Sequence, residues 1–173
     1  TAQREENVDS FKNWKDLIET LNAIEQKYKK NIIVSTHPRT KNQLKKINNI
    51  TINKNIKFLK PFGFSDYVKL QMDAFCVLSD SGTITEETDI LKLKAVMIRN
   101  SHERPEGMDA GTVVMSGLKK QNVLNAIEII TSTALPMKEI EEVEDYKSNL
   151  VSKKILNAVI SYIDYVNRTI WYK

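Results

Sequence analysis

Short apolar runs alternate with helical patterns along residues 9 to 130 of the chain. The clearest runs are Ile32–Thr36 and Phe75–Ser79, and each is followed by a turn and then by a segment with helical periodicity. Strands that are separated by helices pair in parallel, and a parallel sheet needs helices over both of its faces. The sequence therefore predicts an α/β fold built on a parallel sheet.

The same periodicity gives the expected bounds of the elements. Trp14 and Leu17 open an amphipathic pattern whose start either Asp9 or Ser10 caps, and Ser65 is expected to cap a later helix. Helices are expected over residues 9–30, 42–47, 66–72, 85–92, 123–130 and 149–171, and strands over residues 32–36, 57–59, 75–79, 95–98 and 112–115.

The chain is expected to divide near residue 137. Residues 1–137 hold the alternating strands and helices, whereas residues 138–173 hold an acidic connector and a long amphipathic helix. A helix with one apolar face needs a surface to lie on. We expect the sheet domain or a missing partner to provide that surface.

Composition excludes several classes of protein. The chain has 26 Lys and Arg against 22 Asp and Glu, and this evenly spread charge suits anionic small ligands as well as nucleic acid, so it decides for neither. Because Cys76 is the only cysteine, no intrachain disulfide is possible, which fits the cytoplasm. No apolar run is long enough to span a membrane, and no His and Cys residues have the spacing of a metal site.

The segment Ser79–Glu87 is the strongest candidate for a ligand site, because it lies where a strand ends and a helix begins. Backbone N–H groups and the helix dipole attract phosphate at such a place. Ser81 and Thr83 add hydroxyl donors, and Gly82 allows a close approach to the backbone. The alternative is ordinary helix capping, with Ser81 or Thr83 as the N-cap and Glu86 or Glu87 completing a capping box. A Walker loop is excluded, since no Lys follows the glycine.

Other candidates fall on the same rim of the expected sheet. Arg104 lies in a strand-end loop and is suited to phosphate oxygens, although an ordinary surface ion pair is an alternative. His37 follows another strand, where it is either a ligand-binding or a structural residue. Glu87 is placed to accept hydrogen bonds from a ribose diol or to be a solvated charge. Tyr67 either stacks on a base or packs in the core.

Three strings read together carry a resemblance to a known family. Asp80–Glu87 resembles a "D-S-G-G-I-x-E-E" motif, His102–Glu106 resembles "E-R-P-E", and Gln3–Asn7 resembles "H-R-x-E-N". With the third string upstream of the other two, they are similar to the motifs of the non-hydrolysing UDP-N-acetylglucosamine 2-epimerases. The C-terminal sequence and the Ser-Gly-Thr variant of the first motif look closest to the capsule and O-antigen branch, which makes UDP-N-acetyl-L-fucosamine.

The resemblance implies one half of a GT-B fold, namely the C-terminal Rossmann-like half. Thr1–Ala2 resembles the end of the first strand of that half, so the sheet is expected to lack a central strand, which the missing part of the chain or a partner would supply. It implies that the diphosphate is held by the serine, glycine and threonine of the first motif, the ribose by its last glutamate, and the uracil by an aromatic ring and by main chain near Phe62. The UDP-binding residues implied in this way are Arg4, His37, Phe62, Tyr67, Ser81, Gly82, Thr83, Glu87 and Arg104.

The family reaction implies elimination of UDP to a glycal, followed by re-addition with exchange of the C2 proton. Its acids and bases lie in the N-terminal half, which has no counterpart here, so no catalytic residue is identified. Gln3 replaces the family histidine and cannot carry a proton, and Thr83 replaces a glycine. By this likeness the protein needs no cofactor or metal, works in the cytoplasm as a homodimer on a UDP-sugar, and involves neither nucleic acid nor a membrane.

Three functions remain open from the sequence. The first is the nucleotide-binding half of a UDP-sugar 2-epimerase, and the second is a domain of a GT-B glycosyltransferase. The third is a non-catalytic sensor of nucleotide sugars, which Gln3 and the missing half make conceivable. We expect the 173 residues alone to bind UDP weakly and to lack epimerase activity.

Overall fold

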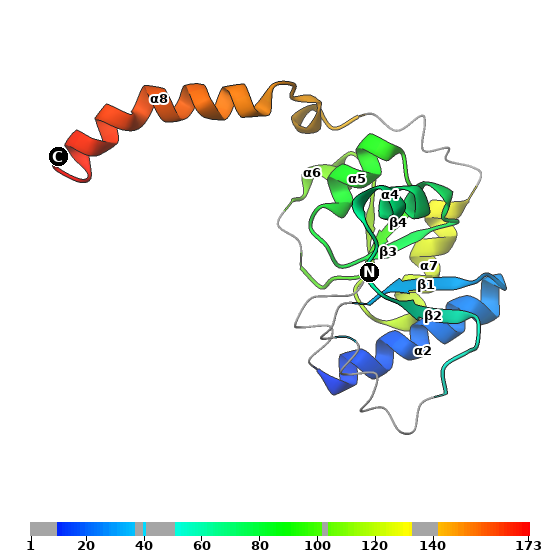
Figure 1. Cartoon of the computed structure of the whole chain (residues 1–173). Helices are drawn as coiled ribbons and strands as arrows, with labels where there is room; N and C mark the ends of the chain where they lie inside the picture. The colour runs from blue at the N-terminus through cyan, green and yellow to red at the C-terminus, as the bar shows by residue number, and fades with distance from the viewer. Residues whose placement is uncertain (1–9, 37–39, 41–50, 102–103, 133–141) are drawn as a thin grey trace. The chain divides into compact units, whose positions relative to one another are not determined.

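The computed structural model describes residues 10–36, 40, 51–101, 104–132 and 142–173. By its internal contacts the chain divides into two compact units, residues 1–142 and 143–173. The boundary expected near residue 137 falls in 133–141, outside the described residues. Each unit is described below by itself (Figure 1).

Helices and strands alternate through the first unit. The helices are α2 (Phe11–Tyr28), α4 (Phe64–Asp73), α5 (Ile84–Leu91), α6 (Glu106–Asp109) and α7 (Lys120–Thr131), and the strands are β1 (Ile32–Ser35), β2 (Ile56–Leu59), β3 (Val77–Ser79), β4 (Ala95–Met97) and β5 (Val114–Met115). The second unit holds a 3-10 turn (Glu144–Lys147) and α8 (Val151–Thr169). Each predicted helix and strand in the described residues is therefore confirmed in type, and the helix predicted over 42–47 lies outside them.

The bounds differ where local chemistry differs from the expected pattern. Ser10 caps α2, and its hydroxyl accepts the Asn13 N–H at 3.4 Å, as predicted. The cap predicted at Ser65 is wrong, because α4 already begins at Phe64 and its N-cap is Gly63. The sequence did not predict α6, since its four residues are too short to show a period.

All strand pairing is parallel, but it forms two sheets instead of the single sheet that the alternation predicts. One sheet pairs β1 with β2, and the other has the order β3-β4-β5. The second sheet is centred on β4, whose residues Ala95–Met97 are all fully buried. The parallel α/β fold is confirmed, and the division into two sheets is a correction.

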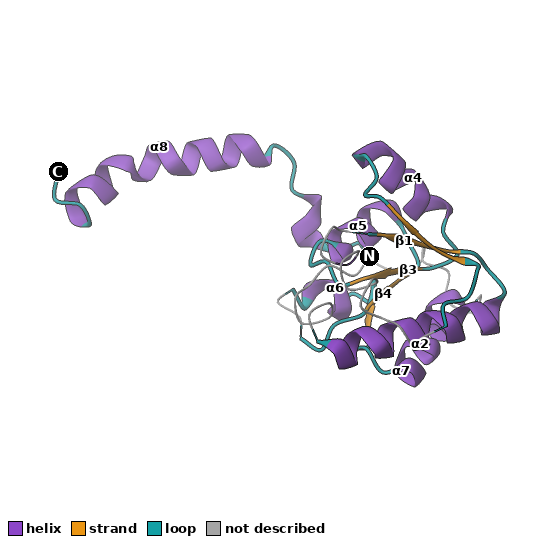
Figure 2. Cartoon of the chain, turned by 60° about the horizontal axis from the view of Figure 1, so that its bottom comes forward, coloured by secondary structure: helices purple, strands orange, loops and turns teal. Residues whose placement is uncertain are grey.

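One helix layer covers both sheets (Figure 2). Helix α2 packs on α7; α2 also contacts β2, while α7 contacts β4 and β5. Their shared core contains apolar side chains of both helices and of both sheets: Trp14, Leu17, Ile18, Leu21, Ile24, Val34, Ile56, Val96, Ile98, Leu118, Val123, Ala126, Ile127 and Ile130. The two sheets are therefore parts of one packed unit.

A smaller core lies on the opposite face of the second sheet. Ile84 of α5 packs there with Ala95 and Met97 of β4 and with Val77 of β3. Alternate residues along β4 thus belong to different cores, as the pleat of a strand requires. This face positions the start of α5 at the carboxyl end of β3, where the candidate site was expected.

The long helix of the second unit has an exposed apolar face. No residue of α8 is buried, and Ile155, Leu156, Val159 and Ile163 are all exposed. Among the described helices, none is long and apolar enough to cross a membrane.

Candidate functional site

The polypeptide turns sharply between β3 and α5, and hydroxyl groups support the turn. The Ser81 N–H donates to Ser79 Oγ at 3.1 Å, and the Thr83 N–H donates to Ser81 Oγ at 3.3 Å. The hydroxyls of Ser81 and Thr83 are 2.9 Å apart. Among the described residues no acceptor pairs with the Gly82 N–H. Because the Thr83 hydroxyl donates to Glu87, the Ser81 hydroxyl donates to Thr83 Oγ1, and the Gly82 N–H is the donor of the turn that has no described partner.

The start of α5 is not capped by a side chain. Thr83 is the N-cap residue, but its side chain makes no capping hydrogen bond. Its hydroxyl donates instead to Glu87 Oε1 at 2.7 Å, so the capping box expected as the alternative does not form. An uncapped helix start retains N–H donors and the positive end of the dipole, and both favour an anion.

Glu87 accepts hydrogen bonds from two side chains, one at the N-cap of α5 and one in α4. Besides the Thr83 hydroxyl, the Gln71 amide of α4 donates to Glu87 Oε2 at 2.5 Å. Each carboxylate oxygen keeps a further lone pair, so the group can still accept from a ligand hydroxyl. The carboxylate is thus fixed in position beside the turn.

Arg104 lies against the turn from the neighbouring loop. Its Nη1 pairs with the carboxylate of Glu86 and is 3.5 Å from the Gly82 carbonyl oxygen. The ion pair considered as an alternative is therefore present. Within the described part of the chain only Nη1 has a partner, and a guanidinium offers five N–H donors. Arg104 can hold Glu86 and still present donors to an anion.

A close contact between α5 and α6 stabilises the turn between β3 and α5. A Cβ on Gly107 would lie 2.9 Å from Thr85 Cγ2, so only glycine fits there without a shift. Thr85 is fully buried, and its hydroxyl donates to the Gly82 carbonyl at 3.0 Å. Gly107 accepts from Thr112 Oγ1 at 2.8 Å. The glycine after the arginine loop therefore fixes α6 against the residue that holds the turn.

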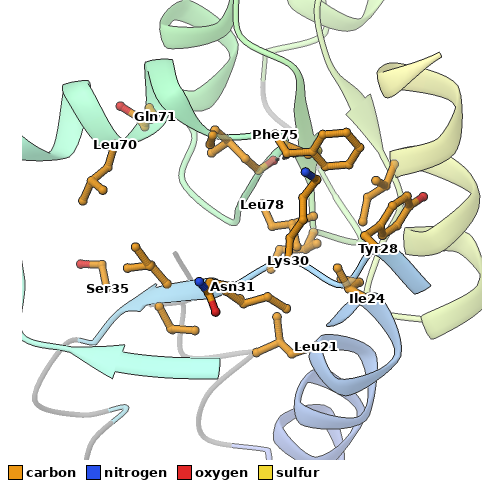
Figure 3. Close-up of a pocket in the computed structure, with 18 of the residues that line it drawn as sticks. Leu21, Ile24, Tyr28, Lys30, Asn31, Ser35, Leu70, Gln71, Phe75 and Leu78 are labelled. Carbon is orange, nitrogen blue, oxygen red and sulfur yellow. Dashed lines mark hydrogen bonds between the residues drawn. The ribbon is translucent and has the colours of Figure 1, made fainter. Parts of the chain in front are cut away.

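Phe62 and Tyr67 line a separate feature, a cavity of about 460 Å³ between β1 and β3. Gln71 also lines it, and Figure 3 shows this side chain on α4 above the cavity. Because Gln71 also bonds Glu87, it joins the cavity to the turn. Cys76 is another lining residue, and burial raises the pKa of its thiol to about 12, so the thiol stays neutral.

The structure thus brings Ser81, Gly82, Thr83, Glu87 and Arg104 into one cluster. Phe62 and Tyr67 lie at the neighbouring cavity. Gln3, Arg4 and His37 lie outside the described residues. No group of acidic, His or Cys side chains suited to a metal ion occurs in the described ranges.

Sequence reasoning missed two members of this cluster. Gln71 lies one helical turn after Tyr67, and that spacing on one face of a helix was the available signal. Glu86 was treated only as a capping residue, whereas it holds Arg104. Both roles depend on tertiary contacts with a loop or helix far along the chain.

The chain matches a family model described as UDP-N-acetylglucosamine 2-epimerase over residues 1–160. A relative of that name from Methanocaldococcus jannaschii is 38% identical over 133 residues, which are 75% of this chain and 36% of the relative. The structure of UDP-N-acetylglucosamine 2-epimerase from Rickettsia bellii has a TM-score of 0.81 and 47% identity, covering 100% of this chain and 46% of that one.

A second solved structure carries ligands. The M. jannaschii enzyme in complex with UDP-GlcNAc and UDP has a TM-score of 0.79 and 32% identity, and the match covers 93% of this chain and 44% of that chain. The chain therefore spans about a third of the curated relative and just under half of the solved ones. By its family match and by this fold, the chain belongs to the UDP-N-acetylglucosamine 2-epimerase family.

Proposed function

We propose that this chain is the nucleotide-binding, C-terminal half of a UDP-sugar 2-epimerase. The observation that carries the proposal is the turn at the uncapped start of α5, with Arg104 beside it. Donors at a helix start and a guanidinium suit a diphosphate, which is the most highly charged part of a UDP-sugar. The family match and the ligands of the M. jannaschii relative support this choice of nucleotide.

Each part of UDP has a proposed partner in this site. Ser81, Gly82 and Thr83 bind the diphosphate oxygens, and Arg104 binds them through the donors that Glu86 leaves free. Glu87, already aligned by Thr83 and Gln71, accepts from the ribose hydroxyls. Tyr67 is proposed to stack on the uracil, with main chain near Phe62 at its edge; Arg4 and His37 complete the proposed set.

The proposed reaction proceeds in two balanced steps. A base removes the C2 proton as the bond from C1 to the UDP oxygen breaks, giving UDP and a glycal. UDP then re-adds at C1 while C2 takes a proton on the opposite face. This half holds the leaving group, and its positive donors stabilise the charge that develops on UDP. The acids and bases are assigned to the remaining polypeptide.

The proposed substrate is a UDP-sugar used for capsule or O-antigen synthesis. This rests on the Ser-Gly-Thr form of the motif at residues 81–83 and on the C-terminal sequence. A threonine in place of glycine keeps the backbone N–H but narrows the site. The complete protein is proposed to be a cytoplasmic homodimer. Sedimentation of the complete polypeptide tests the homodimer, and assays with a panel of UDP-sugars test the choice of sugar.

Calorimetric titration of the chain with UDP tests the binding site directly. We expect Arg104→Ala to weaken UDP binding about 10- to 100-fold, because a charge-assisted contact is lost. Lys54→Ala, which removes an exposed cation before the amino end of β2, should leave it unchanged. Equal effects of the two variants would contradict a specific diphosphate site.

Turnover requires the complete polypeptide. Incubated with its UDP-sugar in D2O, an epimerase incorporates deuterium at C2, and NMR detects it. A glycosyltransferase would instead transfer the sugar to an acceptor without this exchange. If the protein binds UDP but shows neither deuterium exchange nor sugar transfer, the third function, a non-catalytic sensor of nucleotide sugars, would be favoured.

A further inference from the structure

The side chain of Thr83 is directed along α5 and not to the helix start that an N-cap residue usually satisfies. A capping residue reaches the N–H groups of the first turn when its own backbone is extended. The backbone of Thr83 is already helical, with φ −73° and ψ −6°, and no capping hydrogen bond forms. The hydroxyl donates to Glu87 Oε1 at 2.7 Å, one helical turn further on. Thr83 therefore acts on the Glu87 carboxylate.

A chain of hydrogen bonds with one direction ends at this carboxylate. A carboxylate only accepts, so the proton of the Thr83 hydroxyl is committed to Glu87. The Ser81 hydroxyl, 2.9 Å away, then donates to Thr83 Oγ1. Hydrogen bonds in such a chain polarise and strengthen one another. The turn thus supports the bond from Thr83 to Glu87.

Glu87 is held at both oxygens of its carboxylate. Oε1 accepts from Thr83, and Oε2 accepts from the Gln71 amide at 2.5 Å. The backbone N–H of Glu87 also donates to the Thr83 carbonyl at 2.9 Å. Because each carboxylate oxygen has two lone pairs, one acceptor position remains on each oxygen in the described structure. The residue is half-buried, which limits the water that competes for these positions.

Two remaining acceptor positions match a vicinal diol. The 2′- and 3′-hydroxyls of ribose are donors on neighbouring carbons, and the carboxylate can accept one of them on each oxygen. A 2′-deoxyribose supplies only one donor, so one position on the fixed carboxylate loses its partner. A site arranged to bind a hydroxyl rejects the analogue that lacks it, because a polar group of the site is left unpaired.

We propose that Thr83 is a positioning residue that gives the site a preference for ribose over 2′-deoxyribose. It acts through Glu87, because with Gln71 it holds the two carboxylate oxygens in the orientation that the diol needs. Without the threonine hydroxyl the carboxylate rotates more freely, and the advantage of the second ribose hydroxyl is lost. The inference rests on the proposed function, since it assigns the ribose of UDP to Glu87. It names the class of nucleotide, a ribonucleoside diphosphate.

Titration of the chain with UDP and with dUDP tests the proposal, because the two ligands differ only in the 2′-hydroxyl. NMR follows the titrations, since it measures weak binding. We expect the wild-type chain to bind UDP at least about tenfold more tightly than dUDP. Thr83→Val keeps the branched shape but removes the hydroxyl, and it should lower this ratio to about threefold or less. Any contact of Thr83 with the diphosphate is common to both ligands and cancels in the ratio.

Two further variants separate positioning from general effects on the turn. Thr83→Ser keeps the donor, so the ratio should stay at the wild-type value. Ser81→Ala removes a hydroxyl of the same turn but no donor to Glu87, so it should weaken both ligands and leave the ratio unchanged. Thr83 is exposed, so substitutions there should not disturb the fold. An equal fall of the ratio in Ser81→Ala and Thr83→Val would assign the effect to the whole turn and overturn the proposal.

The second donor to the carboxylate gives an independent arm. Gln71→Met removes the hydrogen bond to Oε2 and should lower the ratio in the same way as Thr83→Val. The double variant should bind UDP and dUDP almost equally. If the ratio is unchanged in Thr83→Val, water replaces the threonine hydroxyl and the proposal is overturned.

The outcomes keep this inference apart from the proposed function. Equal binding of UDP and dUDP by the wild-type chain leaves the diphosphate site in place and overturns only the role of Thr83 and Glu87 in ribose recognition. Absence of binding by both ligands contradicts the proposed function, and the inference falls with it.

Discussion

Helices α2 and α8 have similar lengths and similar amphipathic patterns, yet their surroundings differ completely. Trp14 of α2 is 1% exposed and lies in the main core, whereas Ile163 of α8 is 49% exposed. The pattern of apolar residues predicts both helices equally well. It does not say what covers the apolar face. Burial, and not the pattern, should therefore decide how much each side chain contributes to stability.

The largest expected effect comes from truncating the core of α2. Trp14→Ala should lower the free energy of unfolding by about 3–5 kcal/mol, because it leaves a cavity between α2 and the sheet. Urea unfolding followed by circular dichroism measures it. Ile163→Ala in α8 is the matched control and should leave the transition almost unchanged. Similar losses in both variants would mean that α8 is as well packed as α2.

A single added methyl group should also be costly where packing is tight. Gly107→Ala places a Cβ 2.9 Å from Thr85 Cγ2, so α6 must move away from α5. Overpacking of this kind costs about 1–3 kcal/mol, and UDP affinity should fall because Thr85 holds the Gly82 carbonyl. Thermal unfolding and UDP titration measure the two effects.

Gly63→Ala is the control for that change. Its Cβ would have its nearest neighbour at 3.9 Å, an ordinary contact. A large loss of stability in this variant, or none in Gly107→Ala, would show that the contact between α5 and α6 is not tight in solution.

Much of the fold could be predicted, because long apolar patterns fix helices within a few residues. The alternation of strands and helices does not predict the division into two sheets, since a strand such as β1 pairs with whatever lies beside it. Strand ends were also misjudged: the run Phe75–Ser79 is uniformly apolar at first, yet only Val77–Ser79 joins the ladder. Local sequence shows which residues favour a strand, whereas the ladder depends on the neighbour.

The candidate site was predictable only where its residues share one motif. Ser81, Gly82 and Thr83 are consecutive, so the strand-to-helix junction identified them. Gln71 and Glu86 act through contacts with residues 16 and 18 positions away, Glu87 and Arg104 respectively. Nothing in a linear pattern marks such pairs.

Gln71 offers a smaller and more selective test. Gln71→Met keeps the shape but removes the donor to Glu87 Oε2 and the orphaned Oε1. UDP affinity should fall about tenfold, because the carboxylate loses its alignment. Tm should change little, since both a donor and an unpaired acceptor are lost together. Lys69→Met, at an exposed position of α4, is the control. If Gln71→Met lowers Tm markedly together with UDP affinity, Gln71 contributes to stability and not specifically to the alignment of Glu87.

The smallest expected effect lies at the edge of the contact between α2 and α7. Lys27 Nζ and Glu128 Oε2 are 2.5 Å apart, and this hydrogen bond lowers the pKa of Glu128 and raises that of Lys27. Both groups are exposed, so Glu128→Gln should lower Tm by no more than about 2 °C, and salt should remove the difference.

The sign of the pH dependence follows from the two shifts. A lowered pKa at Glu128 means that its contribution is present at neutral pH and is lost as the pH falls through the folded pKa. A raised pKa at Lys27 means that its contribution is lost only as the pH rises through the folded pKa. The Tm difference between wild type and Glu128→Gln should therefore be constant near neutrality and vanish in acid. A difference that persists in acid would assign the effect to packing of the α2–α7 contact and not to its charges.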